Sequence, residues 1–321
     1  MDPRPVLRTG AATVLIAMAT ACSASGPENV PKVTGAAGTR PVITIPDRPA
    51  PRDARLEVLR DGTGPAVRQG QVAVTDVEMR SWEGKKELLS SWGLAQPRTV
   101  SLTGARTART WAGALVGRKA GSRVLMVAPA GGGRPGTDAQ AAAVARLGPD
   151  DHMVLVFDLI GGYDRDQRVP SLHGNGAMPG PSGTRDAKAL VDFGSGAAPK
   201  VVSWGAGPPA RLQVRTLSEG RGPVLQDRDV AVLQYAGWAW GDGRPFGSTY
   251  GASGPRGVVL DRPALLPGMY EALKGIRVGT RLQIAVPPGF RPDFRRTPGG
   301  LEQPPGVPVL YVVDVLDRQD R

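Results

Sequence analysis

The residue types that most often carry catalysis are scarce in this chain of 321 residues. Its two histidines are His152 and His173, and its only cysteine is Cys22. No second histidine or cysteine stands at metal-ligand spacing from either histidine, and a Ser-His-Asp arrangement would need one of these two as its base. Asp150 and Asp151 are typical of a solvated turn. We therefore expect no metal site, no nucleophilic site and no cofactor.

The segment "GIRVG" places Gly275 and Gly279 where a phosphate-binding loop could be suspected. A P-loop needs Gly-Lys-Ser/Thr at the start of a helix, so that backbone N–H groups and a lysine face the phosphate. Here the glycines follow a helical pattern and lead into a strand pattern. They indicate a helix C-cap and a tight turn.

Apolar and aromatic side chains remain as candidates for a functional site, and most of the aromatic residues lie after residue 200. Tyr235, Phe246, Phe290 and Tyr311 come from four separate predicted elements. Such side chains usually form the core of a small domain. They could also line an apolar binding site, and composition alone does not decide between these two interpretations.

The segment of sequence that carries these residues occurs twice in the chain. "VLRDGTGPAVRQGQVAV" begins at Val58 and "TLSEGRGPVLQDRDVAV" begins at Thr216, 158 positions later. The same spacing relates Gly117 to Gly275 and Gly121 to Gly279. A spacing held over so long a segment indicates a duplicated domain rather than a short solenoid repeat.

The second copy shows the structure of one unit. "DVAVLQYAGWAW", "RGVVLD", "TRLQIAVP" and "PVLYVVDVLD" are typical of strands. Between them, "PALLPGMYEALKGI" places apolar residues three and four apart, which predicts one amphipathic helix. We expect an α+β fold in which about five antiparallel strands pack against one short helix in each unit.

The N-terminus is typical of a bacterial lipoprotein. Arg4 and Arg8 precede a short apolar stretch, and "ATAC" places small residues before Cys22. We expect a signal peptide over 1–21, removal of which leaves Cys22 to be diacylated. The alternative is an ordinary secretory signal. The favoured interpretation predicts a protein anchored by lipid to the extracytoplasmic face of the cell membrane.

Pro- and Gly-rich composition divides the rest of the chain. We expect a tether over 22–50, a first domain over 51–163, a linker over 164–200 and a second domain over 201–318. The net charge of +11 comes from scattered basic residues, so we expect a solvated basic surface and no nucleic-acid partner. We expect a monomer.

The second copy resembles FKBP-type peptidyl-prolyl cis-trans isomerases over nearly its whole length. Three segments carry the resemblance in order and almost without gaps: "LQYAGWAWGDGRPFGST", "LLPGMYEALKGIRVGTR" and "QPPGVPVLYVVDVLD". The resemblance implies two tandem FKBP-like domains, each an antiparallel half-barrel sheet wrapped around a helix, with an apolar pocket between sheet and helix. It also implies proline-containing peptides or unfolded secreted proteins as partners.

Carried over by position, the resemblance assigns a pocket to the second domain. The walls would be Tyr235, Phe246, Leu265, Leu266, Phe290 and Tyr311. Met269 would be the floor, where the family usually has Trp, and the backbone N–H of Leu266 would bond a peptide carbonyl. Three positions depart from the family: Gly247 replaces an Asp, Arg256 replaces a pocket-side Phe, and Pro292 replaces a hydrogen-bonding Tyr.

The first copy departs further. Val77 stands opposite Tyr235, and Leu88 stands in place of Phe246. Thr107 and Ala108 stand opposite Leu265 and Leu266. The copy keeps Trp111 on the helix and Phe157 in the last strand. We expect a degenerate copy that keeps the fold and has lost the pocket.

Three functions compete. The leading hypothesis is a membrane-anchored prolyl isomerase and folding helper whose activity resides in the second domain. The rival is a non-catalytic tandem FKBP-like module that binds partner proteins. A solute-binding lipoprotein is disfavoured because it would need two lobes of alternating strands and helices, and each unit offers one convincing helix.

Overall fold

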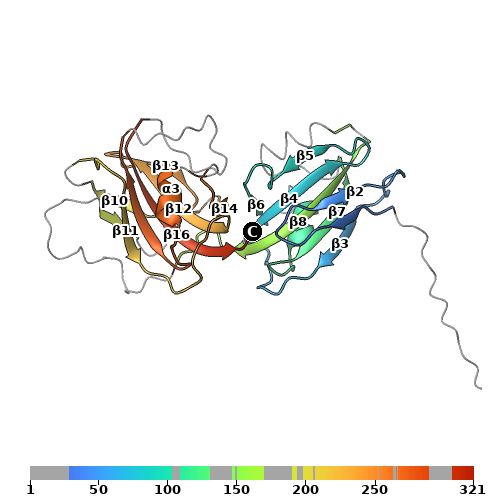
Figure 1. Ribbon diagram of the computed structural model, residues 1–321, viewed down its shortest axis with the longest axis horizontal. Helices are drawn as coiled ribbons and strands as arrows, with labels where there is room; N and C mark the ends of the chain where they lie inside the picture. Colours follow the sequence, from blue (N-terminus) through green and yellow to red (C-terminus); the bar gives the residue numbers. More distant parts are fainter. Residues whose placement is uncertain are drawn as a thin grey trace, which may run out of the picture.

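The computed structural model describes residues 29–102, 109–130, 147–148, 150–169, 190–193, 198–204, 207–251, 253–262, 265, 267–288 and 306–321. Two units lie side by side, one coloured blue to green and the other yellow to red, and the C-terminus lies between them (Figure 1). Each unit is a six-stranded antiparallel sheet with one short helix in its described residues. We call these the N-terminal unit, 55–163, and the C-terminal unit, 213–319.

The N-terminal unit orders its strands β3-β7-β8-β4-β5, and β6 also pairs with β4. Its elements are β3 (Arg55–Arg60), β4 (Val72–Ser81), β5 (Glu87–Ser90), β6 (Arg98–Ser101), α1 (Arg109–Leu115), β7 (Arg123–Pro129) and β8 (His152–Tyr163). The long strands β4 and β8 form the centre of the sheet and are almost entirely buried.

The C-terminal unit repeats this order as β11-β15-β16-β12-β13, with β14 on β12. Its elements are β11 (Gln213–Ser218), β12 (Val230–Ala239), β13 (Pro245–Ser248), β14 (Arg256–Val259), α3 (Pro267–Leu273), β15 (Arg281–Val286) and β16 (Val309–Gln319). The predicted duplication and α+β class are confirmed, with six strands rather than about five. Between β8 and β16 the spacing of equivalent residues is 156 rather than 158. The strand register shows this, since Asp158 pairs with Arg123 as Asp314 pairs with Arg281.

Successive side chains of the central strands point to opposite faces of each sheet. In β12, Leu233 and Tyr235 belong to the cluster that contains the helix residues Met269 and Leu273. Ala236 and Trp238 instead belong to a cluster on the opposite face. This follows from the two-residue period of a strand. We call the first the helix face and the second, which a short β-hairpin covers, the hairpin face.

The glycines of the "GIRVG" segment serve the backbone, as predicted. Gly275 ends α3 with φ of 79°, and Gly117 ends α1 with the same φ. This left-handed conformation is costly for residues that carry a Cβ, so glycine is the natural C-cap. The equivalence shows that the two copies turn the chain identically after the helix.

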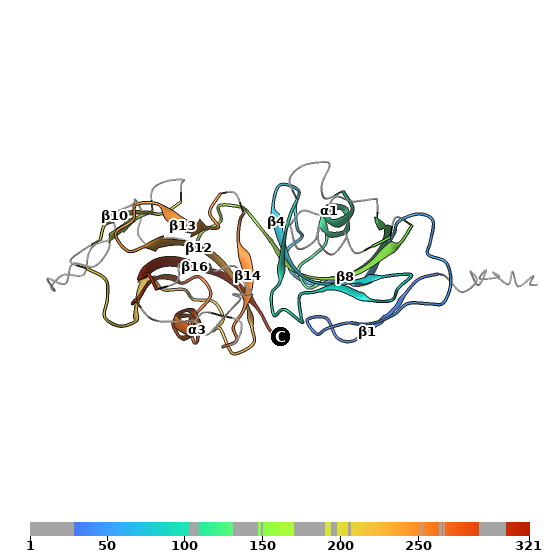
Figure 2. The same cartoon turned by 90° about the horizontal axis from the view of Figure 1, so that it is seen from above.

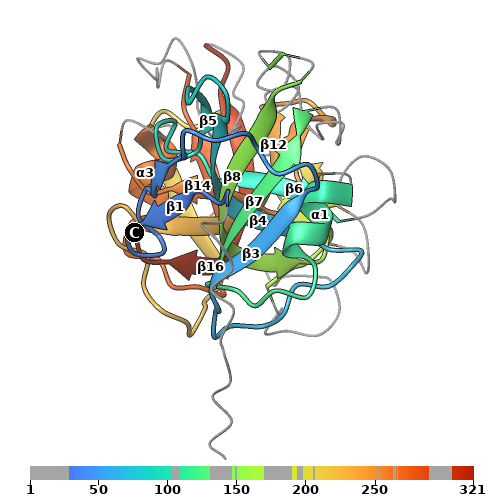
Figure 3. The ribbon, with the colours of Figure 1, turned by 90° about the vertical axis from the view of Figure 1, so that its right-hand side faces the viewer.

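A short hairpin covers the hairpin face of each unit. It consists of β1 (Lys32–Thr34) with β2 (Val42–Thr44) in the first unit, and β9 (Leu190–Asp192) with β10 (Lys200–Ser203) in the second. Each strand of the second hairpin begins 158 positions after its counterpart. Figure 3 shows β1 and α1 on opposite sides of the N-terminal sheet. The repeating unit therefore begins before residue 51.

These hairpins differ from the predicted tether over 22–50 and linker over 164–200. The Pro- and Gly-rich composition concealed a short alternation, in which Ile43 and Ile45 point to one side and pack on Leu125 and Val127. In the second unit Phe193 packs on the hairpin face in the same manner. Three-residue strands give too weak a period to be recognised within such composition.

The two units pack against each other through equivalent apolar residues. The shared buried cluster comprises Val72, Val74, Ile160, Tyr163, Val230, Val232 and Val259, with Leu316 packed against it. Val230 and Val232 are the counterparts of Val72 and Val74, and Leu316 is the counterpart of Ile160. Equivalent surfaces that face each other form an internal two-fold relation, as in an isologous dimer. Consistently, α1 and α3 lie on opposite sides of the molecule in Figure 2.

Candidate functional site

Three aromatic side chains from three strands meet on the helix face of the C-terminal unit. They are Tyr235 of β12, Phe246 of β13 and Tyr311 of β16. The rings of Phe246 and Tyr311 lie edge to face, with centroids 5.7 Å apart and an interplanar angle of 88°. Tyr311 is fully buried, whereas Phe246 is half-buried. Edge-to-face pairing is favourable for aromatic rings and fixes their relative orientation.

Gly237 makes this aromatic arrangement possible. A Cβ at this position would lie 2.7 Å from Cζ of Phe246 and 2.7 Å from Cε1 of Tyr311. Both atoms belong to rigid rings, so any side chain would force the pair apart. The central strand therefore has a glycine where the two rings approach its backbone.

The helix end of the site is apolar and buried. Met269 of α3 is fully buried, and Leu265, just before the helix, is 2% exposed. The N–H of Leu265 donates to the carbonyl of Asp261 at 3.0 Å, which fixes the turn into the helix. Five of the predicted pocket residues thus lie in or against one cluster. Leu266, Phe290 and Pro292 lie outside the described residues.

Sequence reasoning missed Ile284, which pairs with Tyr311 across β15 and β16 and is fully buried in the same cluster. The alternation in "TRLQIAVP" could have identified it, because Leu282 and Ile284 share one face of β15. Ile284 adds a branched aliphatic surface beneath the aromatic pair.

The other described residues that were candidates for catalysis or metal binding have structural contacts. Within the described chain, no three His, Cys, Asp or Glu residues gather as a metal-binding group. Asp151 accepts from the Ser81 hydroxyl at 2.6 Å and so holds a loop. A surface depression lined by Glu219, Gly220, Arg221 and Arg277 shares no residue with the aromatic cluster. His173 and Cys22 lie outside the described residues.

Comparison with known proteins decides the family. The sequence model described as "FKBP-type peptidyl-prolyl cis-trans isomerase" matches residues 222–316. These residues span β12 to β16 and include every aromatic residue of the cluster. The C-terminal unit belongs to the FKBP-type peptidyl-prolyl cis-trans isomerase family.

Individual relatives agree. The "FK506-binding protein" of Streptomyces anulatus is 28% identical over 118 residues, which cover 37% of this chain and 94% of that protein. The "FKBP-type peptidyl-prolyl cis-trans isomerase FkpA" of Escherichia coli K12 is 29% identical over 106 residues, covering 33% of this chain and 37% of FkpA. The crystal structure of FkpA aligns over 34% of this chain and 48% of that chain, at 28% identity and a TM-score of 0.29. The chain thus matches less than half of FkpA.

The departures from the FKBP pattern have different structural settings. Among the described residues, an added Cβ at Gly247 would meet only Cε2 of Tyr235, at 4.0 Å. The described residues therefore leave room for a side chain here, beside the ring of Tyr235. Arg256 begins β14, pairs with Leu233 and is half-buried. A cationic side chain therefore stands where the FKBP resemblance predicts a ring.

The N-terminal unit fills the equivalent space with aliphatic residues. Val77 and Leu88 occupy the positions of Tyr235 and Phe246, as predicted. Strand register places Leu155, not Phe157, at the position of Tyr311, because Leu155 pairs with Met126 as Tyr311 pairs with Ile284. Trp111 occupies the floor position and packs edge to face on Phe157, with centroids 5.0 Å apart. Thr107 and Ala108 lie outside the described residues.

Proposed function

We propose that the C-terminal FKBP domain catalyses cis–trans isomerisation of X–Pro bonds in proline-containing peptides or unfolded secreted proteins. The observation that carries the proposal is the cluster of Tyr235, Phe246 and Tyr311 over buried Met269, in a domain of the isomerase family. No nucleophile, metal or cofactor is required by this chemistry.

The physical argument concerns the amide. Rotation about an X–Pro bond breaks amide resonance, against a barrier of about 18–20 kcal/mol. The twisted amide is less polar than the planar one, so it loses less when it leaves water. An apolar pocket with aromatic walls would therefore bind the twisted state better than the ground state, which is what catalysis requires.

A matched pair of variants in the full chain tests the proposal. Phe246→Ala removes a pocket wall, whereas Leu88→Ala truncates the equivalent position of the N-terminal unit. We expect Phe246→Ala to lower kcat/KM for a prolyl peptide at least about tenfold, the equivalent of about 1.4 kcal/mol. Leu88→Ala should leave kcat/KM unchanged while lowering stability, because a buried leucine is lost.

Failure of the wild-type chain to accelerate isomerisation above the uncatalysed rate would refute the enzyme proposal. It would favour the second candidate, a non-catalytic tandem module that binds proline-containing segments. Gly247 and Arg256 favour that candidate, since both remove family features from the site. Measured peptide binding without acceleration would support it directly.

We further propose that the chain is held on the extracytoplasmic face of the cell membrane by a lipid on Cys22. The proposal rests on the N-terminal sequence pattern. No helix in the described ranges is long and apolar enough to cross a membrane. Cys22→Ala should release the protein from the membrane fraction; a variant that stays bound would refute acylation at Cys22.

A further inference from the structure

The central strand of the C-terminal unit is interrupted along one edge. Its partner β14 ends at the pairing of Arg256 with Leu233, and its partner β13 begins at the pairing of Ser248 with Ala236. Gln234 and Tyr235 therefore fall between two described partner strands. A buried backbone N–H at such a gap needs another acceptor.

Thr249 fills this gap. Its hydroxyl oxygen accepts from the Tyr235 N–H at 2.8 Å, and its own N–H donates to the Tyr235 carbonyl at 2.9 Å. Thr249 is fully buried. Thr249 thus holds both backbone groups of Tyr235, the N–H through its hydroxyl and the carbonyl through its own N–H.

A second contact extends this arrangement to the other unit. The Thr249 hydroxyl donates to Oε1 of Gln234 at 2.8 Å, and Nε2 of Gln234 donates to the carbonyl of Arg165 at 2.8 Å. Gln234 is fully buried, and Arg165 follows the last strand of the N-terminal unit. Three hydrogen bonds therefore link the unit junction to the backbone of Tyr235. We call them the Gln234–Thr249 relay.

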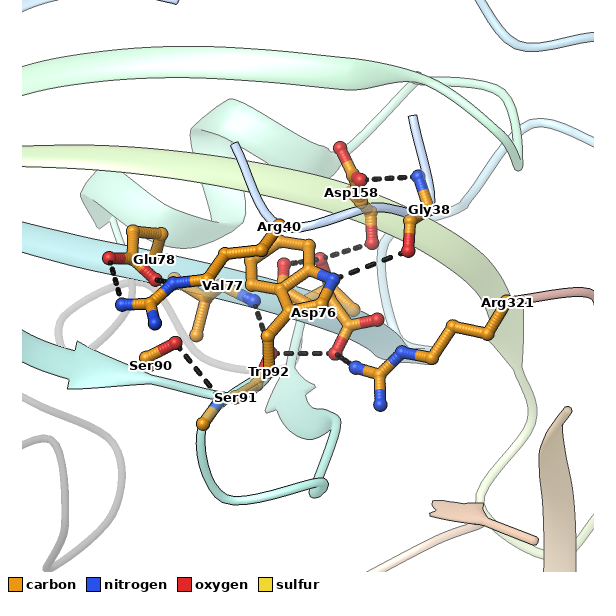
Figure 4. Close-up of polar contacts among 12 residues, drawn as sticks. Gly38, Arg40, Asp76, Val77, Glu78, Ser90, Ser91, Trp92, Asp158 and Arg321 are labelled. Carbon is orange, nitrogen blue, oxygen red and sulfur yellow. Dashed lines mark hydrogen bonds and ion pairs between the residues drawn. The ribbon is translucent and has the colours of Figure 1, made fainter. Parts of the chain in front are cut away.

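The N-terminal unit contains the same relay with different chemistry. The Val77 N–H donates to the Ser91 hydroxyl at 2.9 Å, and this hydroxyl donates to Asp76 at 2.6 Å. Arg321, the counterpart of Arg165, donates to Asp76 from the other unit, as Figure 4 shows. Each relay is thus closed by the residue that follows the last strand of the opposite unit.

We propose that Gln234 and Thr249 are positioning residues of the isomerase site, and that the N-terminal unit completes their relay through the Arg165 carbonyl. This inference rests on the proposed isomerase function. The relay fixes the main chain of Tyr235 and so sets where its ring stands against Phe246 and Tyr311. The N-terminal relay ends on Val77, which has no ring to position.

Kinetics on the full chain test the proposal with matched variants. Thr249→Val removes the hydroxyl and Gln234→Met removes both amide contacts, while Ser91→Ala makes the corresponding change in the N-terminal unit. Each of the first two should lower kcat/KM about three- to tenfold, the equivalent of one lost hydrogen bond. Ser91→Ala should leave it unchanged. Thr249→Ser, which keeps the hydroxyl, should restore it.

Two results would overturn the inference. One is unchanged kcat/KM in Thr249→Val; the other is an equal fall in Ser91→Ala, which would indicate general loss of stability. The combined variant Gln234→Met/Thr249→Val should fall no further than the worse single variant, because both act through one relay. Additive losses would contradict a single relay.

A readout that needs no activity separates this inference from the proposed function. Hydrogen exchange of the Tyr235 amide should be slow in the wild type and faster in Thr249→Val, with Val77 exchange unaltered. A wild type that fails to accelerate isomerisation would refute the enzyme proposal alone. Unaltered Tyr235 exchange in Thr249→Val would refute the relay, whatever the activity.

Discussion

The two units share a backbone and differ in what fills the space between sheet and helix. The C-terminal unit places Tyr235, Phe246 and Tyr311 there, whereas the N-terminal unit places Val77, Leu88 and Leu155 at the same positions. Helix caps, strand order and hairpins are otherwise repeated. The fold therefore depends on turns and buried polar contacts common to both copies, and the three aromatic side chains are present in one copy alone.

A buried ion pair is one of the shared contacts. Arg123 pairs with Asp158 at 2.6 Å, and Arg281 pairs with Asp314 at 2.5 Å, on equivalent strands. Each pair also holds the segment that precedes its own unit. Arg123 donates to the carbonyls of Gly35 and Thr39 at 2.7 Å. In the second unit Asp314 accepts from the Val169 N–H at 3.2 Å, and the Arg281 guanidinium lies over the Phe193 ring.

Breaking this pair should give the largest effect. Arg123→Met would leave Asp158 buried without its cation and would free two hairpin carbonyls, so we expect a loss of about 5 kcal/mol in the free energy of unfolding. Arg281→Met would likewise leave Asp314 buried without its cation, so we expect a loss of similar size. Urea unfolding would measure both, and limited proteolysis would report release of the β1–β2 hairpin. A small loss in either variant, or an unchanged proteolysis pattern in Arg123→Met, would contradict this role of the ion pairs.

The junction offers a second comparison, since the N-terminal relay is charged and the C-terminal relay is neutral. Burial raises the pKa of Asp76, while Arg321 and Ser91 oppose that rise. Arg321→Met would remove the stabilising cation, so the folded-state pKa should rise further. We expect a loss of roughly 3 kcal/mol at pH 7.

The pH dependence of this variant has a defined sign. Because the folded-state pKa of Asp76 lies above its unfolded value, the folded state binds the proton more tightly. Stability is therefore fully retained below the unfolded value and is lost as pH rises through the folded one. The deficit of Arg321→Met should shrink on acidification, whereas that of Gln234→Met should not change with pH. Unfolding curves at several pH values would decide, and equal deficits throughout would exclude Asp76 as the cause.

The sequence predicted the duplication and the fold class, because these depend on spacing and on side chains with strong strand preference. The aromatic residues of the site were predicted by the resemblance to the FKBP family. It did not predict the hairpins, whose three-residue strands lie in Pro- and Gly-rich stretches. It also missed the relays. A turn and a strand separate Gln234 from Thr249 in the sequence. The two residues meet because β13 and β14 leave a gap along one edge of β12, and no local sequence pattern predicts that gap.

The smallest expected effect concerns Gly247, the family position nearest to Tyr235. Since an added Cβ would meet only Cε2 of Tyr235 among the described residues, at 4.0 Å, Gly247→Asp should fit without displacing the strand. A carboxylate beside the pocket restores a polar group that the family has there. By the usual net value of a hydrogen bond, about 0.5–1.5 kcal/mol, kcat/KM should rise roughly two- to tenfold.

Gly247→Ala is the matched control, because it adds the Cβ without the carboxylate and should leave kcat/KM unchanged. An equal rise in both variants would assign the gain to strand stiffness rather than to polar contact, since glycine weakens a strand interior. A fall in Gly247→Asp alone would show that this site works best when dry. The departures of the C-terminal unit from its family would then be adaptations of the pocket, and the N-terminal copy would be the only one in which the pocket has degenerated.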